Sequence, residues 1–243
     1  MKIVSIVLGW NRRDDTLACL LSLSRQEAGC HQHELLLVDN GSDDGTAPAA
    51  RQALPGLAVV SLEANRGFAA AANIGIEMAL EQGADFTWLV NNDALALPGL
   101  LGMLLDATAV EAIGMATPTV CTMDEPDVVW PSAGWRRSLT LAAFDTTARP
   151  PSDEPYDVEW ATGCCLLVRA NVWRRIGLFD PAYVFYYEDH DLCLRARAAG
   201  WRIVHVPRAR VLHRVAGSTG QGSALQMYLL ARASVPFYWR HSR

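Results

Sequence analysis

The sequence has no long apolar run and no paired cysteine motif. No stretch of about 20 consecutive apolar residues occurs, so no membrane-spanning helix is expected. The six cysteines form no Cys-x-x-Cys pair, which argues against a disulfide framework or a zinc site and favours reduced, buried thiols. The first residues lead directly into an apolar strand with no cleavage-like site, so we expect no signal peptide and a cytoplasmic protein.

The glycine-rich loops of common nucleotide-binding proteins are also missing. Neither Gly-x-Gly-x-x-Gly nor a Walker loop follows an expected strand. Residues 9–13 are a poor version of the glycine-rich, basic loop that a sugar-phosphate nucleotidyltransferase would need after its first strand. Dinucleotide and P-loop sites are therefore not indicated.

Charge is unevenly distributed along the 243 residues. The net charge is −5 and 51% of residues are hydrophobic, enough for a sizeable core. Residues 1–160 hold 9 basic and 22 acidic groups, whereas residues 161–243 hold 12 arginines and 4 acids. A basic last third suits an anionic partner, either substrate phosphates or a membrane surface, with a solvated charged face as the alternative. Nucleic acid is disfavoured because the arginines match no known reader motif.

Short apolar strands alternate with helices in the first half of the chain. We predict strands at 3–8, 34–38, 57–62 and 86–90, with a helix in each interval. Asp14 or Asp15 could cap the first helix, and Ser42, Asp43 or Asp44 the second. This βαβαβαβ pattern predicts a parallel sheet flanked by helices, with ligands at the carboxyl ends of its strands.

The second half is less regular. We predict a helix at 98–109, a strand at 113–117 and, after an irregular stretch with short strands at 128–130 and 139–142, a mobile loop at 145–157. Later elements are expected as a strand at 160–169, a helix at 170–176, a helix from 188 ended by Gly200, strands at 202–206 and 210–213, and a final amphipathic helix from Gly222.

Two amides and a carboxylate end the strand at 86–90. Asn91, Asn92 and Asp93 lie where an open α/β sheet faces its ligand. Asp93 is a candidate metal or phosphate-side ligand, but the same residues are common in turns, and both interpretations are open. Similarly, Asp189 could act as a base or only cap its helix, and His213 could be a ligand or a core histidine. His190 is expected to be exposed.

Seven segments in order carry a family resemblance. They are residues 5–12, 38–46, 65–76, 91–93, 162–169, 187–195 and 212–218. Together they resemble the inverting GT-A glycosyltransferases of family 2, in particular the bacterial rhamnosyltransferase-like branch. The resemblance covers nearly the whole chain and implies one GT-A domain, 1–243, with a nucleotide-binding half at 1–117 and a mixed acceptor-side half at 118–243.

The resemblance also implies an activity and its residues. It implies transfer of rhamnose or another hexose from a dTDP- or UDP-linked donor to a glycan or lipid-linked acceptor, in polysaccharide biosynthesis. Asp189 matches the general base, with Glu188 beside it. Donor-binding positions are Trp10, Asn11, Asp39, Asn65, Arg66, Gly67, Asn92 and Asp93, and metal positions are Asp93 and His213.

The match to the family's metal motif is incomplete. The motif here is Asn-Asn-Asp rather than Asp-x-Asp, so a single carboxylate is present. Hard oxygen ligands suit Mg²⁺ or Mn²⁺, and one imidazole favours Mn²⁺. Peripheral contact with the inner face of the membrane is a further expectation. The alternative function is a non-catalytic GT-A-like module that binds an anionic glycan or lipid.

Overall fold

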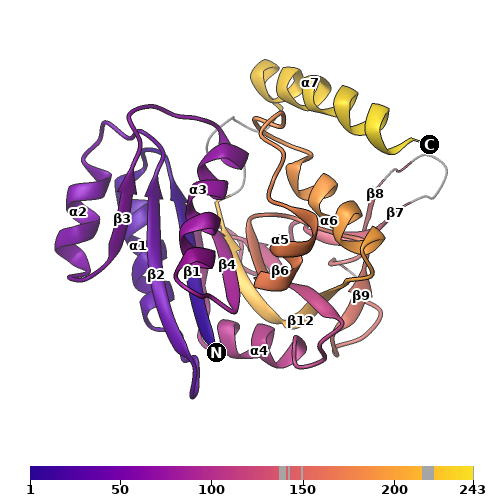
Figure 1. Cartoon of the computed structure of the whole chain (residues 1–243), viewed down its shortest axis with the longest axis horizontal. Coiled ribbons are helices and arrows are strands. Elements are labelled where there is room, and N and C mark those ends of the chain that lie inside the picture. The colour runs from indigo at the N-terminus through magenta and orange to yellow at the C-terminus, as the bar shows by residue number, and fades with distance from the viewer. Residues whose placement is uncertain (137–140, 142, 149, 215–221, 243) are drawn as a thin grey trace.

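A mixed α/β architecture is built around one large sheet with helices on both faces (Figure 1). The computed structural model describes residues 1–136, 141, 143–148, 150–214 and 222–242. The main sheet has nine strands, eight of them in the order β3-β2-β1-β4-β11-β6-β12-β5, and β9 pairs with β12. Among the described residues, no helix is long and apolar enough to cross a membrane.

The first half confirms the predicted βαβαβαβ pattern. Its elements are β1 (Lys2–Gly9), α1 (Arg13–Ser24), β2 (Gln32–Asp39), α2 (Thr46–Ala53), β3 (Ala58–Ser61), α3 (Phe68–Glu81) and β4 (Phe86–Asn91). Strands β1 and β2, β2 and β3, and β1 and β4 pair in parallel. The carboxyl ends of β1, β2 and β4 therefore lie at one edge of the sheet.

The second half adds antiparallel strands to the same sheet. Its elements are β5 (Ala94–Ala96), α4 (Leu100–Ala107), β6 (Ile113–Thr122), β11 (Cys165–Arg169), α5 (Ala170–Ile176), α6 (Glu188–Ala198) and β12 (Arg202–His213). Strand β11 runs antiparallel to both β4 and β6. The predicted strands at 202–206 and 210–213 are one strand, because β12 crosses its register shift between Val206 and Arg210 without ending. Strand β5 was not predicted.

A small second sheet covers one end of the molecule. It consists of β7 (Ala133–Arg136), β8 (Ala143–Asp145) and β10 (Trp160–Ala161), while β9 (Tyr156–Val158) joins the main sheet. The single strand predicted at 160–169 is wrong, because residues 162–164 separate β10 from β11. The loop predicted at 145–157 is bounded by β8 and β9. Of the predicted strand 139–142, only residue 141 lies within the described residues, and 128–130 contributes a single bridge between Cys121 and Val129.

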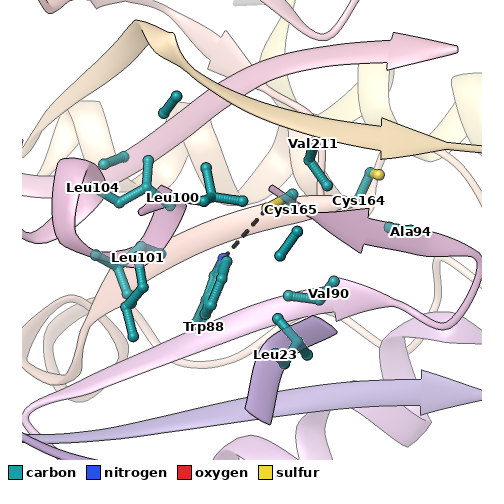
Figure 2. Packing of buried hydrophobic residues seen from close by; sticks show 14 of the residues in the cluster. Leu23, Trp88, Val90, Ala94, Leu100, Leu101, Leu104, Cys164, Cys165 and Val211 are labelled. Carbon is teal, nitrogen blue, oxygen red and sulfur yellow. Dashed lines mark hydrogen bonds between the residues drawn. The ribbon is translucent and has the colours of Figure 1, made fainter. Parts of the chain in front are cut away.

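Two apolar layers hold the helices against the main sheet. Helices α1 and α4 pack on one face, and α3, α5 and α6 on the other. Trp88 of β4 is fully buried in the first layer, and its indole N–H donates to the Cys165 sulfur of β11 at 3.3 Å (Figure 2). All six cysteines are free and five are buried, as predicted, whereas Cys30 is exposed.

Helix α7 (Ala224–His241) lies on the outer side of α6 (Figure 1). Its Ala233 and Phe237 are buried beside Tyr183. The carboxylate of Asp191, in the first turn of α6, lies 2.8 Å from His241 Nε2 and 2.7 Å from Arg195 Nε. The His241 contact attaches the end of α7 to α6, and Arg195 of α6 holds the Asp191 carboxylate in place.

Candidate active site

A cavity of about 500 Å³ opens at the carboxyl ends of β1 and β4. Polar side chains of the sheet edge form one side, and the start of α6 forms the other. Its aromatic lining comes from Trp10, Phe68, Trp130, Trp160, Phe185, Tyr186 and Tyr187, and α7 contributes Gln226 and Leu230. Flat, largely apolar walls with a few convergent polar groups are typical of a site for an organic ligand such as a sugar.

Asp93 and His213 meet at one corner of this cavity. The Asp93 Oδ1 atom lies 3.0 Å from His213 Nε2. Sheet register fixes this contact, because β12 and β5 pair antiparallel with His213 opposite Ala94, the residue after Asp93. The sequence predicted both positions but could not show that they are neighbours across two strands.

This corner fits a cation only in part. Among the described residues, no group of three or more His, Cys, Asp and Glu side chains could hold a metal ion. One carboxylate and one imidazole are present, and the buried His213 Nδ1 has no hydrogen-bond partner within the described part of the chain. Mg²⁺ commonly binds through one or two carboxylates together with substrate phosphates and water. The residues therefore suit a cation that is held jointly with a phosphorylated ligand.

Asn40 connects the tip of β2 to the start of α3. Its Nδ2 donates to the Gly67 carbonyl at 3.2 Å and to Asn65 Oδ1 at 3.1 Å, and its Oδ1 accepts from the Arg66 N–H at 2.9 Å. Asn40 and Asn65 line the cavity, whereas Asp39, Arg66 and Gly67 are not among the described residues that line it. The sequence analysis missed Asn40, although its place directly after a parallel strand was an available signal.

Gly67 is required by the backbone conformation and by the close packing at this position. Its φ is +82°, and a Cβ atom there would lie 2.8 Å from the Val184 carbonyl oxygen. The next amide, Phe68 N–H, donates to the same oxygen at 3.0 Å. The start of α3 is thus packed directly against the aromatic segment that precedes α6.

The turn after β1 is held by the loop after β2. The Asn11 N–H donates to Ser42 Oγ at 2.7 Å, and the Arg13 N–H donates to Asp44 Oδ2 at 2.8 Å. The predicted caps of α1 are therefore wrong: Asp14 and Asp15 lie in its first turn, and its N-cap is Arg12 with no side-chain cap. For α2, the N-cap is Gly45 rather than one of the three predicted residues.

Trp10 and Asn92 both line the cavity at this turn. Trp10 is 41% exposed, so its indole face is accessible to a ligand. Asn92 is buried, and its amide donates to Thr16 Oγ1 at 2.8 Å and to the Asn11 carbonyl at 3.3 Å. Through these hydrogen bonds, Asn92 links the end of β4 to α1 and to the turn before it.

Glu188 and Asp189 form the opposite side of the cavity. Asp189 Oδ1 accepts from the His190 N–H at 2.7 Å, and Oδ2 accepts from the Gly163 N–H at 3.2 Å. Glu188 is buried, and its Oε2 has no partner among the described residues. Burial, with the neighbouring Asp189 charge as a second cause, raises the pKa of Glu188 well above its usual value. This shift favours the protonated form of the Glu188 carboxyl.

His190 is not the exposed residue that the sequence suggested. It is half-buried, lines the cavity and contacts Arg136 Nη2 through Nδ1. Burial, and secondarily the Arg136 charge, lowers the pKa of His190 to about 4. Because a guanidinium can only donate, the neutral ring is assigned with its proton on Nε2.

Comparison with known proteins identifies the family. The family model described as "Glycosyltransferase like family 2" matches residues 2–229. The chain belongs to this family. An N-acetylglucosaminyl-diphospho-decaprenol L-rhamnosyltransferase of Mycobacterium tuberculosis is 36% identical over 216 residues, which cover 78% of this chain and 69% of the relative. The chain is thus a rhamnosyltransferase-like member of family 2, as its sequence motifs predicted.

Solved glycosyltransferases share the fold. GalNAc-T7, solved with UDP, GalNAc and Mn²⁺, superposes with a TM-score of 0.72 at 16% identity over 97% of this chain. The mannosyltransferase PcManGT of Pyrobaculum calidifontis, solved with GDP-Man and Mn²⁺, gives 0.66 at 18% identity over 89% of this chain. The expected GT-A fold is confirmed. This chain spans 48% of the GalNAc-T7 chain and 58% of the PcManGT chain.

Proposed function

We propose that this protein transfers a sugar, with inversion, from a nucleoside diphosphate donor to an acceptor hydroxyl. The donor is dTDP- or UDP-linked rhamnose or another hexose, and the acceptor is a glycan or a lipid-linked saccharide. One observation carries the proposal: a single cavity is lined by the tips of β1 and β4 on one side and by Glu188 and Asp189 on the other.

The donor would bind along the sheet edge. In this arrangement Trp10 stacks on the base, Asp39 binds the base edge, and residues 65–67 line the ribose and phosphates. Asp93 and His213 would hold a divalent cation, Mg²⁺ or Mn²⁺, which when bound offsets the charge of the leaving diphosphate. The Mn²⁺ in both related structures supports a cation at this corner.

The acceptor would bind between the aromatic walls and Asp189. The Asp189 carboxylate takes the proton of the acceptor hydroxyl while that oxygen bonds to the anomeric carbon. The bond from that carbon to the nucleoside diphosphate breaks on the opposite face, so the configuration inverts. The backbone N–H groups of Gly163 and His190 donate to the Asp189 carboxylate. They hold the base in position without supplying a proton for the reaction.

A lipid-linked acceptor agrees with two observations. The mycobacterial relative is named for a diphospho-decaprenol substrate, and α7 exposes a row of large apolar side chains. Among them Met227, Val235 and Trp239 are 65%, 70% and 88% exposed, and the helix has no acidic residue. We propose that α7 contacts the cytoplasmic face of the membrane, where such an acceptor would lie.

The membrane contact can be tested with a pair of valine variants. Val235→Glu on α7 should reduce sedimentation with vesicles that contain anionic lipid, whereas Val110→Glu, at a similarly exposed valine beyond α4, should not. Equal sedimentation of wild type and Val235→Glu would remove α7 from this role.

The activity test begins with the donor. Thermal shift against a panel of dTDP-, UDP- and GDP-sugars should identify one donor, because a bound ligand stabilises the folded state by mass action. Transfer is then measured to a short prenyl diphosphate that carries N-acetylglucosamine. A donor that binds but is neither transferred nor slowly hydrolysed would favour the non-catalytic module.

For the full chain we retain one domain, 1–243, with its donor half at 1–117 and its acceptor half at 118–243.

A further inference from the structure

The carboxylate of Asp93 contacts an imidazole ring and a guanidinium in this structure. Its Oδ1 lies 3.0 Å from His213 Nε2, and its Oδ2 lies 3.4 Å from Arg12 Nη1. The Asp93 side chain is only 8% exposed, and a buried polar group is stabilised by hydrogen-bonded or charged partners. The Arg12 guanidinium therefore lies beside the same carboxylate that would bind a cation.

The backbone at Arg12 is held in an unfavourable conformation. Asn11 and Arg12 have φ values of 56° and 58°, in the left-handed region that an arginine rarely adopts. The backbone N–H groups of Asn11 and Arg13 donate hydrogen bonds to the Ser42 and Asp44 side chains and maintain this turn. Strain of this kind tends to occur at functional positions. Here it accompanies the contact between Arg12 and Asp93.

Arg12 also has a second carboxylate partner. Its Nε lies 3.2 Å from Asp15 Oδ2, while its Nη1 is near Asp93. One guanidinium thus bridges a carboxylate that lines the cavity and another in the first turn of α1. Rotation of the Arg12 side chain can release Asp93 while the contact with Asp15 is kept.

We propose that Arg12 is the counter-ion of Asp93 in the free enzyme and moves to the donor diphosphate when the cation binds. This inference rests on the proposed nucleotide-sugar site. A divalent cation on Asp93 repels the neighbouring guanidinium, whereas the diphosphate supplies two charged groups that arginine binds well. Cation and nucleoside diphosphate consequently bind as a pair, and each strengthens the other by the same factor.

The first test measures Mn²⁺ binding by electron paramagnetic resonance. Wild type should bind Mn²⁺ alone weakly and about tenfold or more tightly with saturating dTDP or UDP. Arg12→Gln should bind Mn²⁺ alone about tenfold more tightly than wild type, with less gain from the nucleotide. Arg13→Gln is the matched control, because Arg13 pairs with the exposed Asp14, and it should resemble wild type. A gain in affinity cannot result from impaired folding.

The second test measures dTDP or UDP binding at saturating Mn²⁺ by calorimetry. Arg12→Gln should weaken this binding about tenfold, as expected for loss of a charge-assisted hydrogen bond, and Arg13→Gln should not. Unchanged Mn²⁺ affinity in Arg12→Gln would overturn the pairing with Asp93, and unchanged nucleotide affinity would overturn the move to the diphosphate. If either result fails but the wild type still transfers sugar, the proposed function stands and only the role of Arg12 is overturned. If both results are as expected but no donor supports transfer, the proposed function is overturned and the role of Arg12 stands.

Discussion

Asp189 Oδ2 accepts a hydrogen bond from the Gly163 backbone N–H at 3.2 Å. This bond joins the first turn of α6 to the segment between β10 and β11, which lie in different sheets. A Cβ atom on Gly163 would lie 3.3 Å from Phe68 Cζ and 3.9 Å from Asp189 Cβ. The carboxylate therefore occupies a position set by three segments that are distant in the sequence.

Replacing this carboxylate should abolish turnover without abolishing donor binding. Asp189→Asn keeps the side-chain shape but cannot take the acceptor proton, so we expect kcat to fall by about 10²- to 10⁴-fold. Calorimetry should give an unchanged donor Kd, which separates loss of the base from loss of the fold. Turnover near the wild-type rate would remove Asp189 from the role of base.

Glu188 should tolerate an amide better than its neighbour does. The pKa of Glu188 is raised in the folded protein. Between the pKa of this carboxyl in the unfolded chain and its raised pKa in the folded protein, only the folded state keeps the proton. Wild type therefore loses stability from Glu188 as pH rises above about 4.5 and through the raised folded-state pKa. Glu188→Gln removes this loss, so its melting temperature should exceed that of wild type at pH 8, and the two should converge near pH 4. A constant difference across this range would contradict a buried, protonated Glu188.

Asp191 should be a main support of α7. It is completely buried beside Arg195 and His241, and breaking a buried ion pair costs about 3–5 kcal/mol. Because both partners are partly in water, we expect Asp191→Asn to lose about 2–4 kcal/mol in urea unfolding. Asp157→Asn, which breaks the exposed pair with Arg202, is the control and should lose no more than about 1 kcal/mol. Equal losses would show that burial does not strengthen the Asp191 contacts.

Gly67 and Gly83 have similar positive φ values but different surroundings, so alanine at each position distinguishes the cost of backbone strain from the cost of steric overlap. Gly67 and Gly83 have φ values of +82° and +77°, but only at Gly67 would a Cβ atom meet neighbouring atoms within 4 Å. Gly83→Ala should lose about 1 kcal/mol from backbone strain. Gly67→Ala should lose about 2–4 kcal/mol because the Val184 backbone must also move. Similar losses in chemical denaturation would mean that the Val184 segment moves aside easily.

Removal of divalent cations should weaken donor binding. We expect EDTA to raise the donor Kd about tenfold or more, and Mn²⁺ or Mg²⁺ to restore it, because the phosphates then lose a shared ligand. Asp93→Asn should abolish this response, and Asp106→Asn, on the exposed side of α4, should retain it. Equal calorimetric affinity with and without cation would exclude Asp93 and His213 as metal ligands.

The strands and helices of the first half were predictable because their signals are local. Each strand up to β4 contains a short apolar run that ends in polar residues, and each of β1, β2 and β3 is followed by a helix. The helix caps were not predictable. Residues near Arg12 obtain their hydrogen bonds from Ser42 and Asp44, about 30 positions away, and a local capping rule cannot include such partners.

Some polar residues that line the cavity were singled out from the sequence, whereas most of its aromatic wall was not. The family motifs identified Asp93, Asp189 and His213, but Trp130, Trp160 and the two α7 residues reach the cavity only through tertiary packing. His190 was assigned wrongly for the same reason, since its environment comes from Arg136 in β7. Side-chain exposure on a short helix depends on what packs against it, and periodicity alone does not give that.

The alignment of β12 with β5 limits where the chain can change length. His213 lies beside Asp93 because it is paired with Ala94, and a one-residue slip turns every side chain of a strand to the opposite face. A single insertion after the irregularity at 206–210 would thus carry His213 away from the cavity while leaving the composition of the strand intact. Homologues should vary in length before this irregularity far more readily than between it and His213.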